Sequence, residues 1–414
     1  MRPWHRIPAL ERESILTKMI NRYCRIPLTS KTSLIVIAFL LFEGIVYPQS
    51  IPDSCMYLGK KPPELIPERF ILEVTTGSFA AERIAISNDG KEIFYTEVKS
   101  YYPATGDTIK CYRFSNRKWR GPFNIFPGYL APALSVTGDT MYFQTAGSGY
   151  ETFMAVKKGK GWTRPQRILK NLNSAHYLQV TGKGDYFISS KSDNTIGEND
   201  WCKLLVANTD SIAQSLGRPV NTEWDNLDFY IAKDESFIII AAPAGLAISY
   251  PKADRGWTSP RSLGKDINFG LASWGPYVTA DKKYLFYSTG TKPDYSDAGI
   301  FWVRIDNLID SLKNTNNVPF LKKSLENQVG FVNRKVDFTI PEGGFIDDDG
   351  ETTFIYSATL NNGQPLPGWL NFDETTGRFS GMPTEPSEYT IIIAAADRAY
   401  AKGLGVFKLT IRDK

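Results

Sequence analysis

The chain has 414 residues, of which 42% are hydrophobic and 13% aromatic, so it can bury a large core and is not a disordered chain. Its length fits two or three domains. The formal net charge of +4 lies entirely within residues 1–50, which hold seven Lys or Arg and three Glu, so the basic balance indicates no nucleic-acid partner.

Residues 1–50 are expected to be a leader that contains a signal peptide. Arg22, Arg25 and Lys31 precede an apolar run over residues 33–42. A basic region followed by about ten apolar residues is typical of a secretory signal and is short of the roughly 20 residues of a membrane span. We therefore expect an exported protein of the periplasm, the outer-membrane surface or the exterior, without a transmembrane span after cleavage. A signal anchor is the alternative.

Three cysteines, Cys55, Cys111 and Cys202, follow the leader. This count is too low for a disulfide framework, and no pair has the spacing of metal ligands. Lipid attachment at Cys55 is an alternative to simple cleavage of the signal.

A hairpin pattern recurs between residues 86 and 290. Each copy is an alternating apolar strand, a turn with Gly, Asp, Asn or Lys, and a second strand rich in aromatic or branched residues. The five copies are residues 86–97, 134–147, 179–190, 230–243 and 277–290. Aligned positions in the second strands are separated by 48, 44, 51 and 48 residues. A period of about 40–50 residues with four short strands per unit is typical of a β-propeller.

A second marker, Trp-x-x-Pro, lies between the hairpins at Trp119, Trp162 and Trp257. It is in phase with the first marker, whereas an ordinary β-sandwich with similar hairpins predicts no fixed period. We assign residues 51–315 to a propeller and read these tryptophans as structural. Five blades are expected, with a strand near residues 69–79 closing the ring against the last blade; six blades are the alternative.

The same segments resemble the exported bacterial propellers with PD40 repeats, which are WD40-like and related to TolB. The resemblance is closest in "VNTEWDNLDFYIAKDESFIIIAAP" and "GWTSPRSLGKDIN" and spans roughly residues 55–315. The family usually carries Ser-Pro-Asp-Gly in the hairpin, and here only "SNDGK" comes near it. The resemblance implies a location in the cell envelope and a binding role, and it implies no reaction.

The composition changes after Asn314, where a polar linker over residues 316–330 precedes a second all-β domain over residues 331–414. Short alternating strands between Gly, Pro and Asn turns indicate a small β-sandwich. The stretch "LPGWLNFDETTGRFSGMPTEPSEYTIIIAAAD" resembles the dystroglycan-type cadherin-like or Ig-like domains of bacterial surface proteins. By this resemblance Trp369 and Phe372 belong to the core and Gly377 makes a hairpin turn.

One acidic stretch of this domain is a candidate calcium site. Asp347, Asp348 and Asp349 stand beside a glycine, and Asp397 joins them if the strand ends meet. Hard cations such as Ca²⁺ need several oxygen ligands, which such a stretch supplies in part. The alternative is a solvated acidic turn, and no other cofactor is expected.

No catalytic residue is predicted. His176 is the single histidine after the leader, so two or three histidines of one chain cannot bind a metal there, and a catalytic triad would have to use this residue. The sequence has no Gly-x-Ser-x-Gly elbow, P-loop or dinucleotide fingerprint.

The loops that lead into the first strand of each hairpin should meet at one mouth of the propeller channel. They offer aromatic side chains and carboxylates, which suit stacking and hydrogen bonding to a carbohydrate or a peptide. The candidate residues are Glu82, Tyr129, His176, Trp224, Asp225, Asp228 and Trp274. Packing between blades is the alternative role for each of them.

The leading functional hypothesis is a non-enzymatic exported binding or scaffold protein, whose partner is a glycan, a peptide or an envelope protein. The alternative is a propeller glycoside hydrolase or lyase that uses carboxylates at the channel mouth.

Overall fold

The computed structural model describes residues 51–100, 104–147, 149–207, 210–253 and 256–413. The expected leader and its signal peptide lie outside the described residues. The described chain is nearly all β, with a 3-10 segment η1 (Asp53–Gly59) and one α-helix, α3 (Asp306–Lys313). Within these ranges no helix has both the length and the apolar character needed to cross a membrane.

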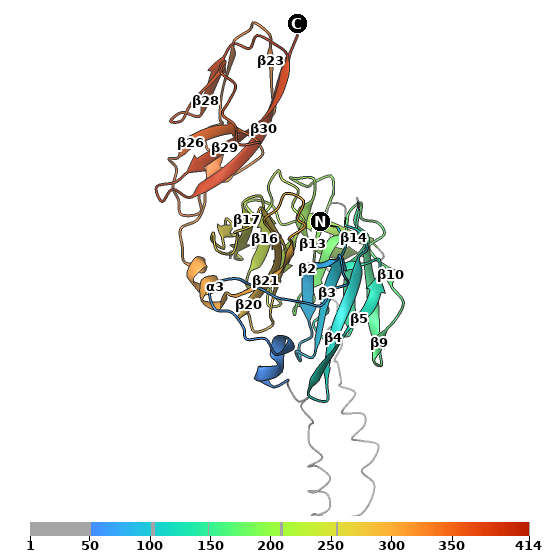
Figure 1. Ribbon diagram of the computed structural model, residues 1–414. Helices are drawn as coiled ribbons and strands as arrows, with labels where there is room; N and C mark the ends of the chain where they lie inside the picture. The colour runs from blue at the N-terminus through green and yellow to red at the C-terminus, as the bar shows by residue number, and fades with distance from the viewer. Residues whose placement is uncertain (1–50, 101–103, 148, 208–209, 254–255, 414) are drawn as a thin grey trace, which may run out of the picture. The chain divides into compact units, whose positions relative to one another are not determined.

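Residues 68–304 form five antiparallel sheets that follow one another along the chain (Figure 1). The first is β2 (Phe79–Ile86), β3 (Glu92–Val98), β4 (Thr108–Ser115) and β5 (Lys118–Pro127). The second is β6 (Leu130–Leu134), β7 (Thr140–Gln144), β8 (Thr152–Lys158) and β10 (Gln166–Arg167), with β9 (Gly161–Trp162) also paired to β8. The third is β11 (His176–Val180), β12 (Tyr186–Ser190), β13 (Asp200–Ala207) and β14 (Asp210–Ser215).

The fourth sheet is β15 (Phe229–Ile231), β16 (Ile238–Ala242), β17 (Gly245–Ser249) and β18 (Arg261–Ser262). The fifth is β19 (Ala272–Val278), β20 (Tyr284–Gly290), β21 (Gly299–Arg304) and the early strand β1 (Glu68–Arg69). All five predicted hairpins are present as the first two strands of these sheets.

The first strands of the five sheets form a closed cycle. β2 lies against β6, β6 against β11, β11 against β15, β15 against β19, and β19 returns to β2. The early strand closes the last sheet, because Glu68 pairs with Trp302 and Arg69 with Phe301. A cycle of sheets in which each covers the face of its neighbour is a propeller-like arrangement.

The core of this ring lies between neighbouring sheets. Phe94 of the first sheet packs with Phe143 of the second in one buried cluster, and Phe187 packs with Phe229 in another. The Trp162 ring stands edge-on to Phe94 with 5.9 Å between ring centroids. Burying each such side chain stabilises the fold by about 1.5–3 kcal/mol.

A polar side chain near the end of the second strand joins neighbouring sheets in four places. Thr96 Oγ1 accepts a hydrogen bond from the Ala131 amide, and Gln144 Oε1 accepts one from the Tyr177 amide. Ser189 and Ser288 donate to the backbone carbonyls of Asn226 and Glu82. These bonds fix the first strand of each following sheet at the end where it enters the ring.

The cysteines of the described chain are free thiols. Cys111 and Cys202 are buried, and Cys55 is partly buried. Burial raises the pKa of the Cys111 and Cys202 thiols to about 12, which keeps both in the unreactive protonated form.

The C-terminal part of the chain forms three further sheets. The largest is β23 (Gln328–Phe331), β30 (Lys402–Arg412), β29 (Ser387–Ala396) and β26 (Ile355–Leu360). The second is β24 (Val336–Thr339), β28 (Arg378–Gly381) and β27 (Leu370–Asp373), and the third pairs β22 (Phe320–Leu321) with β25 (Phe345–Ile346). They enclose one apolar core.

Two details of this domain bear on the sequence-based expectations. Trp369 and Phe372 pack against the core as expected, and Gly377 has φ +66° in the turn between β27 and β28. The domain extends further toward the N-terminus than the expected boundary at residue 331. Leu321 belongs to its core and is 1% exposed, so an apolar pair inside the polar stretch is enough to form a strand.

Candidate functional site

A pocket of about 560 Å³ lies where the first strands of the sheets begin. Six of the seven residues predicted for this mouth line it: Glu82, His176, Trp224, Asp225, Asp228 and Trp274. Among the lining residues that were not predicted, Gln144, Tyr150 and Ser273 have polar side chains. Such a pocket has the size and mixed lining of a site for a small ligand or for one residue of a longer chain.

Tyr129 is not among the residues that line this pocket. Its ring contacts Phe143 and Phe153, each with 5.0 Å between ring centroids, and it also packs edge-on to Phe126. It stands directly before β6, with the side chain in the aromatic layer between strands. Packing, the alternative role considered for each candidate, is the role that the structure gives this residue.

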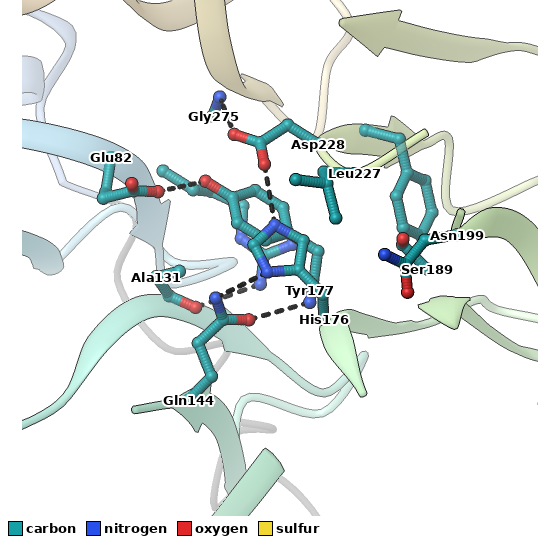
Figure 2. A network of polar contacts seen from close by, with 12 residues as sticks. Glu82, Ala131, Gln144, His176, Tyr177, Ser189, Asn199, Leu227, Asp228 and Gly275 are labelled. Atoms are coloured by element: carbon teal, nitrogen blue, oxygen red, sulfur yellow. Dashed lines mark hydrogen bonds and ion pairs between the residues drawn. The ribbon is translucent and has the colours of Figure 1, made fainter. Parts of the chain in front are cut away.

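His176 is the centre of a hydrogen-bond network at the bottom of the pocket (Figure 2). Gln144 Oε1 accepts from the Tyr177 amide at 2.9 Å, so the Gln144 amide nitrogen is the atom that faces His176 Nδ1 at 2.8 Å. That nitrogen can only donate, so Nδ1 must accept. The proton therefore sits on Nε2, which donates to Asp228 Oδ1 at 2.7 Å.

This arrangement leaves the imidazole with no free nitrogen. In a Ser-His-Asp triad one ring nitrogen binds the carboxylate and the other takes the proton of the nucleophile. Here the second nitrogen is occupied by Gln144, and the side chain is 4% exposed. His176 therefore positions Asp228, and the geometry gives it no role as a general base.

Asp228 has both oxygens engaged. Oδ1 accepts from His176, and Oδ2 accepts from the Gly275 amide at 2.9 Å (Figure 2). The residue is 8% exposed. A buried carboxylate held by two donors is fixed in orientation.

Glu82 lies on β2, in a different sheet, and accepts a hydrogen bond from the hydroxyl of Tyr177. Burial, followed by the negative charges of Asp228 and Glu82, raises the pKa of Tyr177 well above its ordinary value, so its hydroxyl stays protonated and can donate. The Arg83 guanidinium lies over the Tyr177 ring, 4.2 Å from its centroid. Arg83 thus stands behind the carboxylates rather than in the pocket, whose lining does not include it.

A repeated bulge places these side chains. Four of the five first strands show a register shift at the same level, and each shift contains a residue with positive φ. These residues are Glu82 at +72°, Ala131 at +56°, Tyr177 at +59° and Gly275 at +59°. Bulges redirect side chains, and left-handed backbone at non-glycine residues costs free energy that the surrounding fold must offset. No residue type marks this position in the sequence, so the pattern was not predicted.

The loop that carries Trp224 and Asp225 is held by Asn226. The Asn226 side-chain amide donates to the Trp224 and Asn199 carbonyls, each at 2.9 Å. Asp225, which is exposed, accepts from the Asn199 amide at 2.8 Å. A Cβ at Gly197 would lie 2.1 Å from the Trp224 carbonyl oxygen, so this loop packs closely against its neighbour. Trp224 and Asp225 are therefore held in place in the pocket lining.

The pocket is electrically negative. Burial, and then the charges of Asp228, Glu82 and Asp225, raise the pKa of Tyr150 to about 12. All three carboxylates thus act on one side chain, whose ring lies 4.1 Å from the ring of His176. The Arg83 guanidinium, on which Asp228 and Glu82 act, partly offsets these negative charges. The site has the charge to attract a cation and the aromatic rings to stack on it.

No curated protein matches the chain. The solved structures that resemble the chain include TolB from Acinetobacter baumannii, with 14% identity, 53% of each chain covered and a TM-score of 0.35. They also include a putative 6-phosphogluconolactonase from Bacteroides fragilis, with 13% identity, 81% of this chain and 88% of that one covered and a TM-score of 0.34. A further one is the extracellular domain of a putative hybrid two-component system from B. thetaiotaomicron, with 12% identity, 83% of this chain and 45% of that one covered and a TM-score of 0.34. The matches to TolB and to the two-component protein span about half of those chains.

The C-terminal part of the chain matches a protein-family model. Residues 318–412 match the family model described as "Putative Ig domain". The C-terminal domain is Ig-like. The matched range begins two residues before β22, in agreement with the early start of this domain in the structure.

Three of the four predicted calcium ligands of the Ig-like domain, Asp347, Asp349 and Asp397, interact electrostatically. Burial, then the charges of Asp349, Asp397 and Glu351, raise the pKa of Asp347. Asp347 Oδ2 is buried without a hydrogen-bond partner. Glu351 was not predicted, although it lies in the same acidic stretch.

The fourth candidate, Asp348, makes an ion pair with Lys252 at 3.0 Å. Over the ranges that the structure covers, no three acidic, histidine or cysteine side chains are close enough together to hold a metal ion. Calcium binding stays a prediction.

Proposed function

We propose that this protein is an exported, non-enzymatic binding protein, and that its pocket binds a basic group on a peptide, on a glycan or on an envelope protein. The five sheets are, in this proposal, the blades of a five-bladed propeller that β1 closes. The Ig-like domain serves as a spacer or adhesive module, and the expected location is the cell envelope or the exterior.

One observation carries the proposal: three carboxylates and three aromatic side chains line a single pocket in which the only histidine has no free nitrogen. An ammonium or guanidinium group fits such a lining, because Glu82 and Asp228 supply fixed negative charge and Trp224, Trp274 and Tyr150 supply ring faces or edges. Both ring nitrogens of His176 are occupied, so this side chain has no free nitrogen to act as a general base.

The test is a binding comparison between matched ligands. Peptides with lysine or arginine, and glycans with free amino sugars, are titrated by calorimetry beside their N-acetylated counterparts. We expect binding of the basic member of a pair and at least a tenfold loss on acetylation. Glu82→Gln should weaken binding, while Asp266→Asn, at an exposed aspartate that does not line the pocket, should leave it unchanged. Equal binding of acetylated ligands would contradict the choice of a basic ligand.

The same preparations decide the hydrolase or lyase alternative. We expect no release of reducing ends or of unsaturated products from any glycan that binds. Turnover in the wild type that is lost in Asp228→Asn would replace the binding proposal with the enzymatic one.

A further inference from the structure

A second and smaller cavity lies between the first strands, separate from the pocket at the mouth. Its volume is about 40 Å³, and it lies among β2, β6, β11, β15 and β19. One water molecule needs about 10–15 Å³ of such volume, so the cavity holds more than one water or one monatomic ion. It is too small for the kind of ligand that the mouth pocket takes.

The lining of this cavity is cationic. Arg83 and Lys233 both line it, together with the phenol side chains of Tyr230 and Tyr277. No aspartate or glutamate is among its lining residues. Two positive charges that repel each other and lose hydration are costly unless negative charge offsets them. Asp228 and Glu82, which line the mouth pocket, act on Arg83, whereas no carboxylate lines the cavity beside Lys233.

Arg83 has one donor without a partner. Its Nε donates to the Pro132 carbonyl at 3.2 Å and its Nη2 to the Ala131 carbonyl at 3.0 Å. The remaining nitrogen, Nη1, is buried and has no hydrogen-bond partner, and the whole residue is 2% exposed. Arg83 and Pro132 both line the cavity.

Lys233, which follows β15 of the fourth sheet, also lines the cavity. Its ammonium donates to the carbonyls of Leu134 at 3.2 Å and Val180 at 2.9 Å, which leaves one of its three protons for another acceptor. Burial, and then the charge of Arg83, lower the pKa of Lys233 to about 8. A negatively charged acceptor would offset both the burial of the Lys233 ammonium and its repulsion by Arg83.

We propose that this cavity binds a small monovalent anion, such as chloride, between Arg83 and Lys233. The anion accepts a hydrogen bond from the third Lys233 proton and lies beside Arg83, and it neutralises one of the two charges. It ties β2 to β15 across the ring. The proposal does not depend on what the mouth pocket binds.

The test compares anions at constant ionic strength near pH 6.5, where Lys233 is charged. Unfolding is followed in sodium chloride and in sodium gluconate, whose anion is too large for the cavity. Once chloride exceeds its dissociation constant, each tenfold increase should raise the folding equilibrium constant about tenfold, with no such change in gluconate. Lys233→Met, which keeps the length of the side chain, should remove the chloride response. Lys265→Met, at an exposed lysine that does not line the cavity, should retain it.

A second measurement needs no variant. Crystals of the full chain soaked in bromide should show an anomalous peak between Arg83 and Lys233. Equal stability in chloride and gluconate, an unchanged response in Lys233→Met, or water alone at that position in the bromide crystals would each overturn the proposal.

Discussion

Replacing Gly275 by alanine should destabilise the ring of sheets at the point where the last sheet meets the first. Gly275 has φ +59°, which costs a residue with a side chain about 1–2 kcal/mol. An added Cβ would lie 2.6 Å from the Arg83 amide nitrogen and 2.8 Å from the Glu82 carbonyl carbon. Both atoms belong to backbone, so a strand must move, and overpacking of this kind costs about 1–3 kcal/mol. The expected loss in free energy of unfolding is therefore about 2–5 kcal/mol.

Gly138→Ala is the matched control. Gly138 has φ +73°, but an added Cβ there would meet nothing within 4 Å, so only the backbone cost of about 1–2 kcal/mol applies. Urea unfolding of both variants, followed by intrinsic fluorescence, measures the two losses. Gly275→Ala should lose about 1–3 kcal/mol more than Gly138→Ala. Equal losses would show that β19 and β2 do not approach each other as closely as described, and would refute the reasoning.

Three further predictions concern charged groups. Glu97→Gln should cost about 3–5 kcal/mol in urea unfolding, because Glu97 and Lys110 form a buried ion pair at 2.6 Å and the ammonium would lose its partner. The pKa of Lys233 falls from 10.5 to about 8 on folding, so the unfolded chain binds more protons between these values. The contribution of Lys233 to stability should therefore rise with pH from about 8 to 10.5, and the pH dependence of unfolding in Lys233→Met should lack this component. Millimolar Ca²⁺ should raise the melting temperature of the full chain; the shift should vanish in Asp347→Asn and persist in Asp348→Asn, and absence of any shift would remove the calcium site.

Much of the ring could be predicted from the sequence because its signal is local. The turn and the alternating strands of each hairpin are encoded within about 12 residues, and their recurrence predicted five units of similar sheets. The closing strand was expected near residues 69–79 and is found at residues 68–69, since the last repeat lacks a fourth strand of its own. The start of the Ig-like domain was placed too late because Phe320 and Leu321 stand among polar residues.

The sequence predicted only those site residues that lie in the loops leading into the first strand of a hairpin. Six of the seven mouth residues were found in this way, because the first strand of every hairpin is the inner one. Gln144 and Tyr150 were missed because Gln144 is the last residue of β7 and Tyr150 lies between β7 and β8, whereas the candidates were taken from the loops that lead into the first strands. The tautomer of His176 depends on Gln144, which lies 32 positions earlier, and no local pattern reports such a contact.

The small cavity was not predictable at all. Arg83 and Lys233 stand in different hairpins and read as ordinary surface charges, and only the fold brings them to one place. The repeated bulge was equally hidden, because glutamate, alanine, tyrosine and glycine occupy the same structural position.

The seam formed by β1 and β21 has a consequence for the assembly state of the protein. It consists of two residue pairs, reinforced by the bonds from Arg69 Nη2 to the Ala298 carbonyl and from the Phe70 amide to the Ile300 carbonyl. Proteolytic nicking between residues 70 and 79 would free β1 and uncover a row of unpaired backbone groups along β21. A preparation that has lost residues 68–70 should therefore self-associate by pairing along this edge, which β1 covers in the intact chain.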